Sequence, residues 1–104
     1  MKRVAFKMKL KPGCAAEYRR RHDEIWPELV EALRTAGISD YSIFLDEETL
    51  VLFAVQTLAD DHTAATLPQH PVMRRWWDFM ADLMATHPDH APVCRELPQV
   101  FHLD

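Results

Sequence analysis

The 104-residue chain is poor in the residues on which several common functional sites depend. Its two glycines leave no room for a glycine-rich phosphate loop, which argues against a nucleotide cofactor. Its two cysteines, Cys14 and Cys94, lie far apart and fit no close-spaced metal or redox motif, and the sequence alone does not decide whether they pair. No apolar run has the length of a membrane-spanning helix or the pattern of a signal peptide. We therefore expect a cytoplasmic protein with reduced cysteines.

The chain also lacks an excess of positive charge, because 16 acidic residues outnumber 12 basic ones and the net charge at neutral pH is −4. The only basic cluster is Arg19–Arg21, and Glu17, Asp23 and Glu24 surround it. We expect a solvated helix face with internal ion pairs there, and neither a nucleic acid nor a membrane as partner. The proportions of 48% hydrophobic and 27% charged residues are typical of a globular protein, and the length fits one domain over 1–104.

Hydrophobic periodicity predicts elements in the order β-α-β-β-α-β, which is typical of the ferredoxin-like α+β fold: an antiparallel sheet with helices on one face. Pro27 lies inside the first predicted helix, so we expect a kink or a restarted turn near Trp26, and Gly37 is well placed to end that helix. Prolines mark a loop over 86–92. The expected elements are a strand over 3–10, a helix over 14–36, strands over 38–45 and 50–57, a helix over 71–85, and a last strand over 99–103.

The strand over 50–57 is apolar on both faces from Leu50 to Val55. A strand in a sheet with one face in water should alternate instead, so the face turned away from the helices needs a cover. In so small a chain, a second copy of the same sheet is the simplest cover. The sequence therefore predicts a homodimer.

The most informative pattern in the chain is Tyr18, His22 and Trp26, which are spaced four apart and should share one helix face. Two rings beside a titratable imidazole suit a small polyhydroxylated ligand, because the rings stack on C–H faces and the imidazole moves a proton. The alternative is an aromatic stripe that packs into the core. Tyr41 likewise fits either a hydroxyl that reaches the ligand or an ordinary strand residue.

Trp76 and Trp77 form a second aromatic feature. Adjacent helical residues point about 100° apart, so the two indoles cannot lie equally deep in one core. Either one packs while the other faces a cleft or an interface, or both are packing residues.

The six histidines do not form a metal motif. His87 and His90 flank Pro88-Asp89 without the helical His-Glu-x-x-His spacing of a zinc hydrolase. No serine lies in a nucleophile elbow, and Cys14 has no evident activating partner. We expect neither a metal nor a cofactor, and chemistry limited to proton transfer by His22, which contributes on the order of 10²–10⁴-fold in rate.

Four segments together resemble the L-rhamnose mutarotase family, and the resemblance extends over essentially the whole chain. They are Arg20-Arg21-His22, Ile25-Trp26-Pro27-Glu28-Leu29, Arg75-Trp76-Trp77 and Val100-Phe101-His102-Leu103. The resemblance implies a dimeric ferredoxin-like α/β barrel that interconverts the α and β anomers of L-rhamnose without a cofactor. It also implies that His22 is the proton donor and that Tyr18, Tyr41, Trp76 and Trp77 contact the sugar. The loop His87–Ala91 and His102 depart from the family pattern, which leaves a contribution of the loop or the tail open.

In the implied reaction, His22 gives a proton to the ring oxygen while the C1 hydroxyl loses one to another group. The sugar opens to the aldehyde, C1 rotates about the C1–C2 bond, and closure gives the other anomer. Trp26 is not among the implied sugar contacts, so we expect it to pack and to fix the kink. Two other functions remain open: a cofactor-independent monooxygenase of the same barrel class, and a non-catalytic sugar-binding module.

Overall fold

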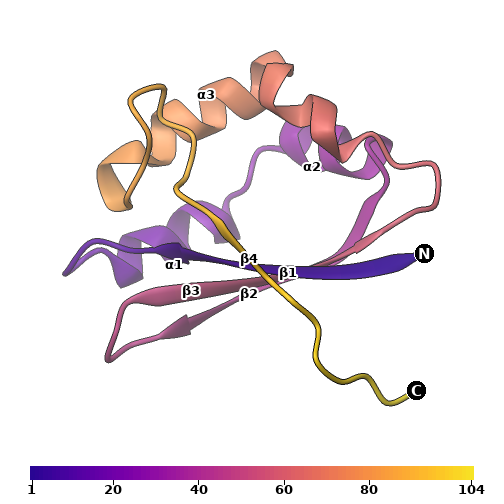
Figure 1. Cartoon of the computed structure of the whole chain (residues 1–104). Coiled ribbons are helices and arrows are strands. Elements are labelled where there is room, and N and C mark those ends of the chain that lie inside the picture. Colours follow the sequence, from indigo (N-terminus) through magenta and orange to yellow (C-terminus); the bar gives the residue numbers. More distant parts are fainter.

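The computed structural model describes residues 1–104 and contains one antiparallel sheet with all helices on one of its faces (Figure 1). The strand order is β2-β3-β1-β4, which together with the alternation of helices and strands confirms the predicted ferredoxin-like α+β fold. The strands are β1 (Lys2–Lys9), β2 (Ile38–Asp46), β3 (Val51–Leu58) and β4 (Arg95–Leu97). The helices are α1 (Ala15–Asp23), α2 (Pro27–Thr35) and α3 (Pro71–Met80), with 3₁₀ turns η1 (Ala64–Gln69) and η2 (Ala81–Leu83). No helix is long and apolar enough to cross a membrane.

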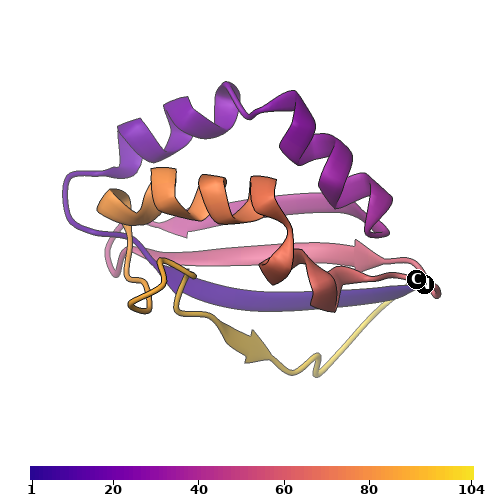
Figure 2. The same cartoon turned by 90° about the horizontal axis from the view of Figure 1, so that it is seen from above.

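The first helical segment is two helices, because the chain restarts at Pro27 as the sequence predicts. Trp26 is the N-cap of α2 with an extended backbone (φ −65°, ψ 131°), and Pro27 occupies the first helical turn, where its missing N–H costs nothing. Gly37 follows the end of α2 with φ +90°, a left-handed conformation that ends helices and favours glycine. Figure 2 shows α1 and α2 as separate segments that meet at an angle above the sheet.

The second predicted helix is shorter than expected: α3 ends at Met80, and the chain is no longer helical after Leu83. The segment that follows pairs with the end of β1 instead. The Lys11 N–H donates to the Leu83 carbonyl at 2.8 Å, and the Ala85 N–H donates to the Lys9 carbonyl at 2.9 Å. Tertiary pairing therefore overrides the helical pattern of this segment, and the predicted loop over 86–92 follows it.

The predicted last strand over 99–103 is wrong. The fourth strand is the three-residue β4, which begins four residues earlier in the chain, and it pairs with β1 from Ala5↔Leu97 to Lys7↔Arg95. Pro98 follows directly and has no N–H for the ladder, so pairing stops there. Residues 98–104 continue as an arm without secondary structure.

The core lies between the sheet and the helices, and the opposite face of the sheet is open. Leu10, Leu29 and Leu52 are the largest fully buried side chains, and all belong to this single layer of packing. On the opposite face, Phe44 pairs with Phe53, and these two rings are 62% and 37% exposed. The single chain therefore leaves apolar rings of its sheet in water, as the two-sided apolar strand predicts.

Candidate active site

An open cleft of about 1510 Å³ lies between the sheet and the helices, and every predicted site residue lines it. Tyr18 and His22 come from α1, Tyr41 comes from β2, and Trp76 and Trp77 come from α3. The fold thus brings together side chains that are far apart in the sequence. Trp26 does not line the cleft.

His22 has a defined tautomer. Its Nδ1 lies 3.0 Å from the Tyr18 carbonyl oxygen one turn earlier, and a carbonyl only accepts, so Nδ1 carries the hydrogen in the neutral ring. Nε2 then bears the lone pair. It has no partner in the chain and is not fully buried, so it is open to a ligand in the cleft. Burial lowers the pKa of His22 below its ordinary 6.5, which favours the neutral imidazole at neutral pH.

The rings around His22 are buried, but their polar atoms are not. Tyr18 stacks on His22 with ring centroids 4.3 Å apart, and Trp76 meets His22 edge-on at 5.4 Å. Only 9% of Tyr18 and 6% of Trp76 are exposed. No fully buried side-chain nitrogen or oxygen lacks a hydrogen bond, so the unpaired Tyr18 hydroxyl and Trp76 indole N–H must be accessible. These two residues therefore pack in the core and also line the cleft, so the ligand-binding and the core-packing interpretations both apply to them.

Trp26 packs, as expected from its place before Pro27. Its ring lies 5.1 Å from Trp76 in an edge-on arrangement and 5.5 Å from Phe79. It occupies the N-cap position of α2 without a side-chain cap, so its side chain contributes packing only. Because α1 ends at Asp23, the predicted common helix face holds only Tyr18 and His22, and the prediction is wrong for Trp26.

Tyr41 faces the cleft because β2 contains an extra residue. Ser39 pairs with Thr57 and Ser42 pairs with Val55, so three steps along β2 match two along β3. Such a bulge reverses which face the following side chains occupy. Asp40 lies in the bulge with φ +48°. If the regular ladder continued from the pair Ser39↔Thr57, Tyr41 would lie opposite Val55 on the open face.

The hydroxyl of Tyr41 meets a residue that the sequence analysis missed. Burial raises the pKa of Tyr41 to about 12, and the side chain of Gln56 close to the hydroxyl partly offsets this effect. Gln56 also lines the cleft. Its signal in the sequence is an amide directly after the apolar run from Val51 to Val55, on the face of β3 that also carries the buried Ala54 and Leu58.

Trp77 lies at the side of the cleft nearest the loop after α3. The Arg74 guanidinium lies 5.3 Å from the Trp77 ring centroid and 3.4 Å from Asp89 of the loop. Ala91, Pro92, Cys94 and Glu96 follow and line the cleft. The loop, which departs from the family pattern, therefore does border the pocket, whereas none of residues 98–104 lines it.

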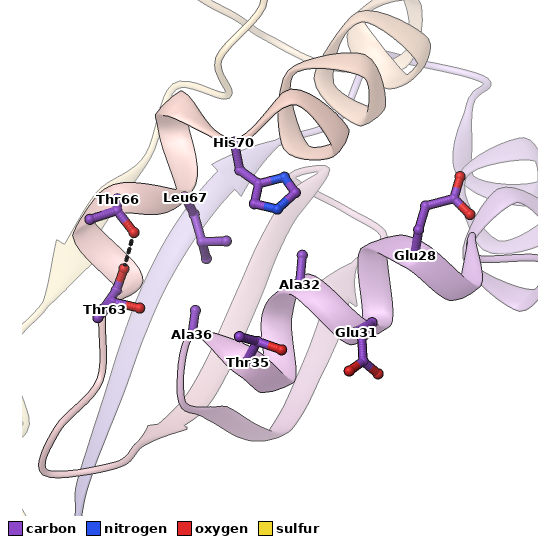
Figure 3. A pocket seen from close by; sticks show the side chains of 9 residues that line it. All are labelled: Glu28, Glu31, Ala32, Thr35, Ala36, Thr63, Thr66, Leu67 and His70. Atoms are coloured by element: carbon purple, nitrogen blue, oxygen red, sulfur yellow. Dashed lines mark hydrogen bonds between the residues drawn. The ribbon is translucent and has the colours of Figure 1, made fainter.

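A smaller pocket of about 340 Å³ lies between α2 and η1, away from His22 (Figure 3). His70 is its only ring, and the His70 Nδ1 accepts the Val72 N–H as a helix cap. The pocket contains none of the predicted site residues. Its lining residues are Glu28, Glu31, Ala32, Thr35, Ala36, Thr63, Thr66, Leu67 and His70.

Comparisons with known proteins agree on one family. The family model described as L-rhamnose mutarotase matches residues 3–103. The L-rhamnose mutarotase of Jannaschia sp. (strain CCS1) is 61% identical over 103 residues, which cover 99% of each chain. That of Rhizobium johnstonii is 60% identical over 103 residues, covering 99% of this chain and 97% of the relative.

A solved structure agrees with these sequence matches. The crystal structure of L-rhamnose mutarotase from Formosa agariphila superposes with a TM-score of 0.93 at 46% identity and covers 100% of both chains. None of these relatives is a monooxygenase, and the match in sequence and in fold spans the whole cleft. The chain belongs to the L-rhamnose mutarotase family.

Proposed function

We propose that this chain interconverts the α and β anomers of L-rhamnose and that His22 transfers the proton in the reaction. The observation that carries the proposal is the His22 ring itself. Its Nδ1 hydrogen is held by the Tyr18 carbonyl, its Nε2 has no partner in the chain, and the ring lines the cleft while it packs against Tyr18 and Trp76. A neutral imidazole held in this way can accept and return one proton without a cofactor.

The depressed pKa of His22 sets the order of the proton transfers. Nε2 first accepts the proton of the C1 hydroxyl, the bond between C1 and the ring oxygen breaks, and its electron pair leaves on the ring oxygen. The imidazolium then gives the proton to that oxygen. The hydroxyl oxygen and the ring oxygen are both bonded to C1 in the closed sugar, so Nε2 can accept the proton from one and donate it to the other. His22 is thus the donor to the ring oxygen, as the resemblance implies, but it begins as a base.

The remaining cleft residues bind and orient the sugar. Burial raises the pKa of Tyr18 above its usual range and that of Tyr41 to about 12, so both phenols stay protonated and can donate to sugar hydroxyls or to the developing alkoxide. Trp76 and Trp77 offer ring faces to the C–H groups and the C5 methyl of the open or closed sugar. Rotation about the C1–C2 bond and reversal of the steps give the other anomer.

Exchange NMR of L-rhamnose tests this function directly. Saturation of one anomeric proton should transfer to the other faster with the protein than without it. His22→Ala should reduce the catalysed exchange on the order of 10²–10⁴-fold while the fold is retained. His87→Ala, an exposed histidine in the loop, is the matched control and should exchange like the wild type. Binding of the sugar without faster exchange would identify a sugar-binding module instead.

We further propose that the chain works as a homodimer joined through the open face of its sheet. The exposed Phe44 and Phe53 on that face support this proposal. The arm over 98–104 supports it too, because it leaves the sheet on the side opposite the helices (Figure 1) and exposes Val100 by 93% and Phe101 by 76%. We expect the dimer to work in the cytoplasm, where the free thiols of Cys14 and Cys94 would remain reduced.

A further inference from the structure

Helix α1 carries His22 but is weakly anchored by apolar packing. Tyr18 is its only buried residue, and both of the next two positions, Arg19 and Arg20, are exposed. The link to α2 over Glu24–Trp26 is not helical, so α2 does not continue the axis of α1. Some other contact must fix the rotation and the height of this helix above the sheet.

Arg21 provides that contact. Its guanidinium crosses from α1 to the end of α3, where Nη1 donates to the Phe79 carbonyl at 2.6 Å and to Asp82 Oδ1 at 2.8 Å. Nη2 donates to Asp82 Oδ2 at 3.2 Å, and Nε donates to Glu17 at 2.7 Å. The guanidinium also lies 4.5 Å from the Phe79 ring centroid. One side chain therefore binds a carbonyl at the end of α3, pairs with Asp82 of η2 and pairs with Glu17 of its own helix.

Arg21 differs in this respect from Arg20 beside it. The Arg20 side chain is 56% exposed and pairs only with Glu17 and Glu24 of its own helical segment. Arg20 therefore matches the solvated face that the sequence predicts for the arginine cluster. The Arg21 side chain is 12% exposed, and its partners Phe79 and Asp82 lie about sixty residues away in the chain. The prediction of a solvated face is wrong for Arg21.

The aromatic contacts connect Arg21 to the reacting group. Phe79 lies under the Arg21 guanidinium, its ring is 5.8 Å from Trp76, and Trp76 is 5.4 Å from His22. His22 is also the next residue of α1. A shift of the last turn of α1 would therefore move His22 relative to Trp76, and it would change the spacing of the two cleft walls.

We propose that Arg21 is a positioning residue that locks α1 to the end of α3 and so sets the place of His22 in the cleft. Arg21 neither lines the cleft nor touches the sugar in this role. The proposal rests on the proposed function of His22. A misplacement of about 1 Å at a catalytic group can cost on the order of 10²-fold in rate, so the lock matters for turnover more than for binding.

Three variants and one control test the proposal. Arg21→Met keeps the length of the stem but loses every donor, and Asp82→Asn removes the charge of its partner without changing shape. Arg21→Lys keeps the positive charge but loses the planar set of guanidinium donors, so it should retain only part of the function of Arg21. Arg20→Met is the control, since it removes an arginine of the same helix that makes no contact with α3.

We expect kcat for anomer exchange to fall about tenfold to a hundredfold in Arg21→Met, with KM changed less, and to fall by a smaller factor in Asp82→Asn and Arg21→Lys. Arg20→Met should retain wild-type kcat. Unchanged kcat in both Arg21→Met and Asp82→Asn would overturn the proposal. The proposal would also be overturned if kcat fell in all variants, Arg20→Met included, only in proportion to the fraction of unfolded protein.

A second readout does not depend on activity. The pKa of His22, measured by NMR titration, reports how far water reaches the ring. In the wild type, burial of the ring lowers this pKa. In folded Arg21→Met the pKa of His22 should rise toward 6.5, and in Arg20→Met it should stay at the wild-type value. An unchanged pKa in Arg21→Met would count against the lock even if the wild type showed no mutarotation, so failure of this proposal is distinct from failure of the proposed function.

Discussion

At the scale of single residues, the chemistry depends on which form of His22 is present. Its ring is stacked on Tyr18 and edged by Trp76, so water reaches it poorly and the charged form is disfavoured. The hydrogen bond to the Tyr18 carbonyl opposes this effect, but burial is the larger influence and the pKa of His22 falls. The enzyme should therefore start its cycle with neutral His22.

This protonation state predicts the pH dependence of the reaction. The active neutral form is complete above the pKa of His22 and is lost as the pH falls through it, so kcat/KM should be constant from neutral pH upward. It should fall on the acid side with a midpoint below 6.5. No alkaline loss is expected near neutrality, because the pKa of Tyr41 is raised to about 12.

The measurement is kcat/KM for anomer exchange across the pH range, after subtraction of the spontaneous reaction at each pH. His22→Ala should lack the acid limb. If kcat/KM instead rose as the pH fell through this range, the imidazolium would be the starting form and the order of proton transfers given above would be reversed.

At the scale of elements, the sequence pattern finds what depends on local chemistry and misses what depends on pairing between strands. The restart at Pro27 and the helix end at Gly37 follow from backbone constraints of single residues, and both are confirmed. The bulge at Asp40 is different, because it exists only in the register between β2 and β3. An aspartate, which tolerates positive φ, was the available signal.

The fourth strand was misplaced for a related reason. Residues 99–103 have a stronger strand composition than Arg95–Leu97, yet Arg95–Leu97 is the segment that reaches the edge of β1 before Pro98 stops pairing. Propensity alone does not tell which segment meets an open strand edge. The site is affected less, since the spacing of Tyr18 and His22 on one helix predicts that their side chains lie together. For Tyr41 the sequence pattern leaves two interpretations open, and the resemblance favours the sugar contact.

The bulge leads to a prediction about Asp40. Asp40→Val places a β-branched residue at φ +48° and should destabilise the fold by about 1–3 kcal/mol. Relaxation of the bulge would also turn Tyr41 from the cleft toward the open face, so KM for L-rhamnose should rise. Asp40→Gly is the matched control, because glycine adopts positive φ without strain and should stay near the wild type in both respects.

Urea denaturation and exchange kinetics of the two Asp40 variants provide the measurements. Asp40→Gly also loses the exposed ion pair with Arg3, which contributes little at 3.5 Å. If Asp40→Val matched Asp40→Gly in both stability and KM, the bulge would not be what aims Tyr41 into the cleft.

At the scale of the whole molecule, the apolar surface is distributed unevenly. The helix face of the sheet is covered, whereas the other face exposes Phe44 and Phe53, and the arm exposes Val100, Phe101 and Leu103 on the same side (Figure 1). Large apolar side chains exposed on one side of a folded protein favour an interaction site there. A second copy offers a matching apolar face of the same shape, and a two-fold axis would bring each arm toward the partner's sheet.

The homodimer proposal therefore predicts the behaviour of three variants in size-exclusion chromatography with light scattering at micromolar concentration. The wild type should have the mass of a dimer. Phe44→Glu should dissociate it, because a carboxylate would be buried in the interface without a partner. Phe101→Glu should weaken it through the arm, and the control Ala65→Glu, an exposed residue of η1 on the helix side, should leave it dimeric. A well-folded wild-type monomer at that concentration would reject the interface, and the open sheet face would then need another explanation.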